Sequence, residues 1–395
     1  MIFLSMSNLL WLLLPIAAAS GWYVARREYR QSVATDSKIS PSEYVKGLNY
    51  LLNEQSDKAI DIFVQMLESD EDVIEMHLAV GSLFRQRGEV ERAIRIHQNL
   101  IARQGLSDDV KSQALLELAR DYLRAGLFDR TEDLCLEIVD SNSDNLAALS
   151  ILKDIYEQEK EWFRAIDVAR KIESFGGEPM ASVVAQYFCE LALEAKRKGD
   201  SIQAKRMLEK AFLEDPQCAR AAILLGDMEK EAENYRAAII SYRRLEDIAP
   251  QYLSEIYRSM LECYEAMGWQ KKILPYLQVL LDKHHGVELV LVFAQVLKEQ
   301  KGIDAALSFL SGDLAGKPSL RGISCLFELE SEQTRRRRKF STLARHSLNK
   351  LLENKPAYRC RNCGFTAVAM HWNCPSCKQW STINAVQEFQ WGASI

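Results

Sequence analysis

The chain has 395 residues, of which 48% are hydrophobic and 27% charged, so its composition supports a large buried core and excludes a disordered protein. The net charge of −5 is unevenly divided, because residues 335–395 carry +9 and residues 1–334, with 39 basic and 53 acidic side chains, carry −14. The sequence contains no GxxxxGK[ST] or GxGxxG motif, and so gives no support to the common nucleotide-binding classes of enzyme.

Residues 1–25 are predicted to form a transmembrane anchor. No charged residue precedes Arg26, which leaves about the 20 apolar residues that a helix needs to cross a bilayer. Three arginines follow the apolar run and none precedes it, which argues against the main alternative, a cleaved secretory signal. By the positive-inside rule, we expect a single-pass membrane protein with its N-terminus outside and the bulk of the chain on the cytoplasmic side.

A polar linker over residues 26–42 leads to a predicted tetratricopeptide-repeat array over residues 43–318. Small and aromatic residues recur with a period near 34, so that Gly81 and Phe84 repeat Gly47 and Tyr50. Alanine recurs in the same pattern, at Ala59, Ala93, Ala119, Ala165, Ala204, Ala211, Ala238, Ala294 and Ala306. Paired helices approach closely only where the crossing side chains are small, so we expect an all-α superhelical solenoid. The alternative, a helical bundle, does not require this recurrence.

The first helix of each repeat is expected to line a groove that binds partner proteins. Five basic residues at such positions are candidates for client contact, although an ordinary surface residue is the more common case for any single one of them: Arg85, Arg120, Arg220, Lys230 and Arg258. Residues 319–356 are predicted to form C-terminal capping helices, where the period fades. The basic run Arg335–Lys339 within them fits a solvated surface, an acidic protein surface or anionic lipid.

Two CxxC units give the strongest local signal, in the predicted C-terminal domain of residues 357–395. Ten residues separate the two units, whose members are Cys360, Cys363, Cys374 and Cys377. A CxxC turn presents two thiolates to one ion while its backbone amides support the sulfurs, so two turns build a closed tetrahedral site. We predict a small rubredoxin-like or zinc-ribbon domain, here called the ribbon, that needs its ion to fold. The spacing does not choose between zinc and iron.

Within the ribbon, Gly364 falls where the first bend needs positive φ. Aromatic side chains around the cysteines are expected to dock the ribbon on the last repeats; they are Phe365, Trp372, Trp380, Phe389 and Trp391. The other five cysteines are scattered singly, as buried thiols often are, so the distribution favours a reducing compartment over a disulfide framework.

The sequence favours a binding protein over an enzyme, because four thiolates leave a metal no open position and the repeats carry no catalytic pattern. The alternative function is a metal–thiolate redox or electron-transfer protein, which an iron site would permit. Zinc ribbons often bind nucleic acid, but the anchor and the acidic array count against a nucleic-acid partner. The oligomeric state is left open, a homo-oligomer included.

The order of parts, with the endings Tyr358-Arg-Cys-Arg-Asn-Cys-Gly-Phe365 and His371-Trp-Asn-Cys-Pro-Ser-Cys-Lys-Gln-Trp380, resembles the lipopolysaccharide assembly protein B family of Gram-negative bacteria over essentially the whole chain. The resemblance implies an inner-membrane adaptor that helps an FtsH-type membrane protease degrade the deacetylase of the lipid A pathway. It also implies a lipopolysaccharide-sensing inner-membrane partner and a part in assembling the synthesis machinery. The family's four cysteine positions are matched by the two CxxC units.

Overall fold

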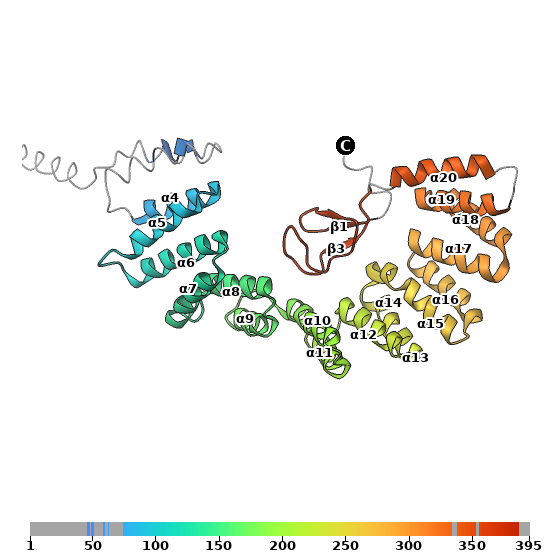
Figure 1. Cartoon of the computed structure of the whole chain (residues 1–395), viewed down its shortest axis with the longest axis horizontal. Coiled ribbons are helices and arrows are strands. Elements are labelled where there is room, and N and C mark those ends of the chain that lie inside the picture. Colours follow the sequence, from blue (N-terminus) through green and yellow to red (C-terminus); the bar gives the residue numbers. More distant parts are fainter. Residues whose placement is uncertain are drawn as a thin grey trace, which may run out of the picture. The chain divides into compact units, whose positions relative to one another are not determined.

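The computed structural model describes residues 74–333, 338–352 and 355–386, with isolated positions at 46, 47, 49, 50, 58, 59 and 62. The described chain is a succession of paired helices followed by a small three-stranded sheet (Figure 1). The prediction of a helical repeat array with a small C-terminal ribbon is therefore confirmed. Within the described residues, no helix is long and apolar enough to cross a bilayer. The predicted anchor and linker, residues 1–42, lie outside these residues.

The chain divides into two compact units. The first comprises residues 1–161 and 174–177, and the second comprises residues 162–173 and 178–395. In the first unit, α4 packs on α5 and α6 packs on α7. Its described helices are α4 (Ile74–Arg87), α5 (Val90–Ile101), α6 (Asp108–Ala125), α7 (Phe128–Ser141) and α8 (Leu146–Glu159).

The second unit holds the remaining helices and the ribbon. The helices are α9 (Trp162–Ser174), α10 (Ala181–Arg197), α11 (Ser201–Glu214), α12 (Ala219–Glu231), α13 (Tyr235–Arg243), α14 (Leu245–Ile248), the 3-10 helix η1 (Pro250–Glu255), α15 (Tyr257–Ala266), α16 (Gln270–Lys283), α17 (Val287–Lys301), α18 (Ile303–Gly316), α19 (Leu320–Gln333) and α20 (Arg338–Leu352). The ribbon strands are β1 (Tyr358–Cys360), β2 (Thr366–Ala367) and β3 (Ile383–Ala385). After the repeats, α19 packs on α18 and α20 packs on α19.

Small residues allow the close approach of paired helices. All of the recurring alanines are fully buried. At Gly226 in α12, an added Cβ atom would lie 2.3 Å from a ring carbon of Tyr242, a fully buried residue of α13. At Gly81 in α4, an added Cβ atom would come equally close to the His97 ring of α5. In both pairs, a glycine of the first helix therefore contacts a ring of the second helix. Any larger residue at the glycine position would hold the two helices apart.

We expect Gly226→Ala to destabilise the second unit by about 1–3 kcal/mol, because the added methyl group overpacks the contact with Tyr242. Gly312→Ala is the matched control, since nothing lies within 4 Å of the Cβ position at Gly312 in α18. Alanine there should raise stability by about 0.5–1 kcal/mol, as in an unhindered helix interior. Urea unfolding followed by circular dichroism measures both changes, and unchanged stability of Gly226→Ala would contradict the close packing.

Candidate metal centre

Four cysteine sulfurs converge in the ribbon. The sulfurs of Cys360, Cys363, Cys374 and Cys377 all lie within 4.8 Å of one another. The distance between sulfurs is 3.8 Å for Cys360 and Cys377, and 3.7 Å for Cys363 and Cys374. Zinc–sulfur bonds of about 2.3 Å in a tetrahedron place neighbouring sulfurs about 3.8 Å apart. The four side chains therefore fit one tetrahedral metal ion, and iron suits the same thiolate set.

Two similar turns present the cysteines. In the first turn, the Gly364 amide donates to the Cys360 carbonyl at 3.1 Å, and in the second, the Lys378 amide donates to the Cys374 carbonyl at 2.9 Å. The residue after each second cysteine is left-handed, with φ of +77° at Gly364 and +59° at Lys378. The predicted positive φ at Gly364 is thus confirmed. Lys378 occupies the equivalent place in the second turn, although no glycine marks it in the sequence.

The environment of the sulfurs supports metal binding. Burial opposes ionisation of the Cys360 thiol, but the Thr382 hydroxyl and the backbone amides of its own turn lower the pKa of Cys360 to about 6. At Cys374, burial dominates and raises the pKa to about 11, although the amides of the second turn oppose it. Metals bind the thiolate form, so donors fixed by the turns favour the charge state that an ion requires.

The ribbon has little structure of its own around the cysteines. Its sheet has the order β2-β1-β3, with β1 antiparallel to both neighbours and Cys360 opposite Ile383. Its buried core consists of Cys360, Cys374 and Ile383, with Phe365 among the partly buried side chains packed against them. Two of the three core side chains, Cys360 and Cys374, are candidate metal ligands. The ion would therefore complete the core of the ribbon as well as crosslink its two turns.

Lys378→Gly is expected to stabilise the ribbon by about 0.5–1 kcal/mol, because glycine adopts positive φ without the steric cost that a Cβ atom brings. Gly364→Ala, at the equivalent position, should destabilise it by about 1 kcal/mol for the same reason. Steric crowding is not the cause of this destabilisation, since the nearest atom to the Cβ position at Gly364 lies 3.8 Å away. The temperature of metal release from each variant measures the difference; equal shifts in one direction would refute this account.

Two tryptophans dock the ribbon on the helices of the second unit. The Trp380 ring centroid lies 6.0 Å from that of Tyr187 in α10 and 6.3 Å from that of Trp162 in α9, both edge to face. The Trp372 ring lies 4.9 Å from Tyr252 in η1. The Tyr252 hydroxyl also donates to a ribbon carbonyl, that of Ser381, at 3.1 Å. Such aromatic pairs add about 0.5–1.5 kcal/mol each beyond the area they bury.

Arg220 of α12 lies beneath both tryptophans. Its guanidinium carbon is 5.9 Å from the Trp372 ring centroid and 5.8 Å from that of Trp380. The Arg220 side chain is only 7% exposed and forms an ion pair of 2.7 Å with Glu190 in α10. At this candidate groove position, the chain's own ribbon therefore takes the place expected for a partner. The ribbon contacts α9, α10, α12 and η1, which corrects the expectation that it docks on the last repeats.

The other four candidate groove residues differ in how they contact neighbouring side chains. In the first unit, Arg85 pairs with Glu117 at 2.6 Å and with Asp121 at 2.7 Å, and Arg120 also pairs with Glu117. Asp121 is fully buried and lies 2.5 Å from His97 Nδ1, so Arg85 belongs to a buried network that sequence patterns did not reveal. These contacts hold α4, α5 and α6 together.

In the second unit, the Lys230 ammonium donates to the Ser259 hydroxyl at 2.9 Å and pairs with Glu262 at 3.0 Å. The Arg258 side chain is 95% exposed, and its distance to Glu262 is 3.7 Å. Of the five candidates, Arg258 is thus the most accessible to a partner, whereas Arg220 is the most buried. The ribbon-docking residues Trp162, Tyr187 and Tyr252 were missed, because their sequence positions resemble ordinary core aromatics.

Comparisons with known proteins agree with both parts of the fold. A family profile described as a rubredoxin metal binding domain matches residues 358–385, and one described as a tetratricopeptide repeat matches residues 189–252. Lipopolysaccharide assembly protein B of Escherichia coli strain K12 is 36% identical over 385 residues, covering 97% of this chain and 99% of that protein. The protein of the same name from Haemophilus influenzae is 33% identical over 391 residues, covering 96% and 98%.

Solved structures resemble the repeats only loosely. The crystal structure of MamA gives a TM-score of 0.33 at 18% identity, covering 44% of this chain and 96% of that one. The C-terminal part of a tetratricopeptide-repeat protein from Cytophaga hutchinsonii gives 0.40 at 12% identity, covering 68% and 99%. Similarity at this level carries no argument about function.

Proposed function

Because the chain belongs to the lipopolysaccharide assembly protein B family, we propose that it is a membrane-anchored adaptor in lipopolysaccharide biosynthesis and not an enzyme. The observation that carries the proposal is the identity of 36% with a curated relative over 97% of this chain. Stacked tetratricopeptide repeats support it, since such solenoids offer extended concave surfaces to other proteins. The four-thiolate site also supports it, because a closed cage suits a structural ion better than a catalytic one.

In this proposal, the adaptor promotes degradation of the deacetylase of the lipid A pathway by an FtsH-type membrane protease, and it helps to assemble the synthesis machinery. A lipopolysaccharide-sensing inner-membrane protein is a further partner. Residues 1–25 anchor the chain in the inner membrane, with the N-terminus in the periplasm and the repeats in the cytoplasm. Tethering raises the concentration of a bound client beside a membrane protease, so no chemistry by this chain is required.

The metal, zinc or iron, has a structural role in this proposal. When bound by Cys360, Cys363, Cys374 and Cys377, it would hold the two turns of the ribbon in the shape that docks on the helices. The visible spectrum and metal content of the purified chain distinguish this structural role from the alternative, a redox or electron-transfer protein. Colourless, zinc-loaded protein supports the structural role, and a reversible iron–thiolate chromophore supports the alternative.

The test of the adaptor function compares the intact chain with a variant that lacks residues 1–25. We expect the shortened chain to bind the deacetylase in a pull-down but to leave its half-life in cells long. A third variant, in which an unrelated single-pass segment replaces residues 1–25, should restore rapid degradation. Rapid degradation of the deacetylase with the shortened chain would refute the need for tethering. Failure of the intact chain to bind the deacetylase would show that the deacetylase is not its client.

A further inference from the structure

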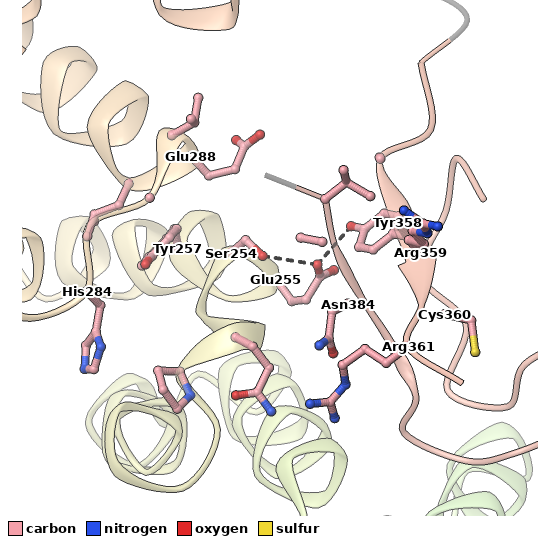
Figure 2. A pocket seen from close by; sticks show the side chains of 18 of the residues that line it. Ser254, Glu255, Tyr257, His284, Glu288, Tyr358, Arg359, Cys360, Arg361 and Asn384 are labelled. Carbon is pink, nitrogen blue, oxygen red and sulfur yellow. Dashed lines mark hydrogen bonds between the residues drawn. The ribbon is translucent and has the colours of Figure 1, made fainter. Parts of the chain in front are cut away.

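A cleft of about 1150 Å³ lies beside the docked ribbon, inside the second unit (Figure 2). One wall comes from η1, the start of α15, the turn between α16 and α17, and Arg321 of α19. The opposite wall comes from the ribbon, including β1 and β3. Sites for small molecules usually measure about 300–1000 Å³, so this cleft has room for a short stretch of polypeptide.

Two acidic groups line the cleft, and both contact neighbouring side chains. Glu255 accepts hydrogen bonds from the Tyr358 hydroxyl at 2.9 Å and from the Ser254 hydroxyl at 3.4 Å, and Figure 2 shows both. Glu288 forms an ion pair with Arg321. Glu288 is therefore balanced by the Arg321 cation, whereas Glu255 is held only by neutral hydroxyls and keeps its negative charge. The two arginines of the opposite wall, Arg359 and Arg361, outnumber that one carboxylate.

Basic groups of the ribbon wall remain available. Arg359 and Arg361 flank Cys360 on the ribbon, line the cleft and are exposed. Neither is paired with a carboxylate in the part of the chain that the structure describes. On the opposite wall, the 15-residue helix α17 begins at the cleft, and its N-cap Gly286 has no side chain to cap it. The first turn of that helix also carries Glu288, which offsets the positive end of the helix dipole. The positive charge offered to a ligand therefore comes from the two guanidinium groups.

The lining also includes apolar side chains. Val287 and Val386 line opposite walls, and Val368 of the ribbon lines the cleft with 80% of its surface exposed. Exposed apolar groups beside unpaired arginines suit a ligand that combines acidic and apolar side chains. A polypeptide segment has this combination, whereas a free phosphate or a sugar phosphate does not.

We propose that the cleft binds an extended acidic segment of a partner protein. The proposal rests on the adaptor function above and names the surface that a partner would use. Because one wall belongs to the ribbon, the site exists only while the ribbon is folded and docked. A ligand that touches both walls binds the docked state preferentially, so metal, docking and partner binding reinforce one another.

The test measures fluorescence anisotropy with the full chain in a mild detergent and a labelled peptide, Glu-Val-Glu-Gly-Glu-Leu-Glu-Gly. The control peptide has glutamine in place of each glutamate. We expect the acidic peptide to bind, and the double variant Arg359→Glu, Arg361→Glu to bind it at least about tenfold more weakly. Arg206→Glu, a charge reversal at an exposed arginine of α11 outside the cleft, should leave binding unchanged. Metal content is measured for each variant, because the two arginines flank Cys360, a candidate metal ligand.

A steric variant provides an independent test. Gly286 lines the cleft with extended backbone, and nothing lies within 4 Å of its Cβ position, so tryptophan can be accommodated there and would fill the cleft. We expect Gly286→Trp to weaken peptide binding by at least about tenfold. Gly312→Trp is the matched control, since Gly312 is equally open and lies outside the lining.

Several results would overturn the proposal. Equal binding by Gly286→Trp and Gly312→Trp would exclude the cleft as the site, and equal binding of the glutamine peptide would exclude recognition of charge. Tighter binding of a single-stranded oligonucleotide than of the acidic peptide would assign the cleft to nucleic acid. No binding by metal-loaded intact chain would also overturn it. These measurements use purified chain and peptide, whereas the adaptor function is tested by the half-life of the deacetylase in cells. Failure of this site can therefore be distinguished from failure of the adaptor function.

Discussion

Replacing Cys360 and Cys363 together by serine is expected to unfold the ribbon and release it from the helices. The strands of the ribbon contain three, two and three residues, and two of its three buried core side chains are candidate metal ligands. Structural zinc sites of this kind provide about 10–16 kcal/mol of apparent binding free energy, which is folding energy for a domain without another core. Loss of two ligands should therefore remove both the ion and the folded ribbon. Metal analysis and mass spectrometry of protease fragments measure the two effects.

The matched control for that variant is Cys325→Ser in α19, a partly buried thiol outside the ribbon. It should keep about one ion per chain, as the single four-thiolate site requires, and protect residues 355–386 from cleavage. Removal of metal from the intact chain with a chelator should reproduce the double variant. Undiminished protection of the ribbon in the double variant would show that packing alone holds it, contrary to the small core.

The convergence of the four cysteines and the helical repeats could be predicted because both depend on short-range spacing. Two thiolates can face one ion only from a tight turn, so the CxxC spacing implies its own geometry. Close pairing of helices needs small side chains at regular intervals, and the recurring alanines are buried as that rule requires. In both cases, the residues that matter lie within about one repeat of each other in sequence.

The docking of the ribbon could not be predicted in the same way. Tyr252 and Ser381 are 129 residues apart, and no local pattern connects them. Trp162 and Tyr187 lie at helical positions where an aromatic residue usually packs within the repeat, so neither sequence position indicates a contact with the ribbon. Arg220 falls on the first helix of a repeat, which predicts a groove position, but what covers it is decided by tertiary packing. The position of a residue within a repeat therefore predicts which face of the array it lies on, but not what covers that face.

Arg220→Met is expected to undock the ribbon while leaving its ion in place. Methionine keeps much of the side-chain volume but leaves the Glu190 carboxylate without its cation and removes the guanidinium from the two tryptophan rings. Breaking a buried ion pair by removing one partner costs about 3–5 kcal/mol. Glu190 is 21% exposed and can recover some hydration, so we expect a loss nearer 2–3 kcal/mol. Urea unfolding measures it, with Arg258→Met as the exposed control.

Hydrogen exchange separates this effect from general destabilisation. Amides of β1 and β3 should exchange faster in Arg220→Met, whereas those of α17 and α18 should change little. A double-mutant cycle with Trp380→Leu should give a coupling energy of about 0.5–2 kcal/mol, the range for a partly desolvated cation over an aromatic ring. A coupling near zero would mean that Arg220 acts only through Glu190. Because the cysteine variant loses the ion and this variant keeps it, comparing client half-life in the two shows whether the adaptor needs the metal itself or the docked ribbon that the metal maintains.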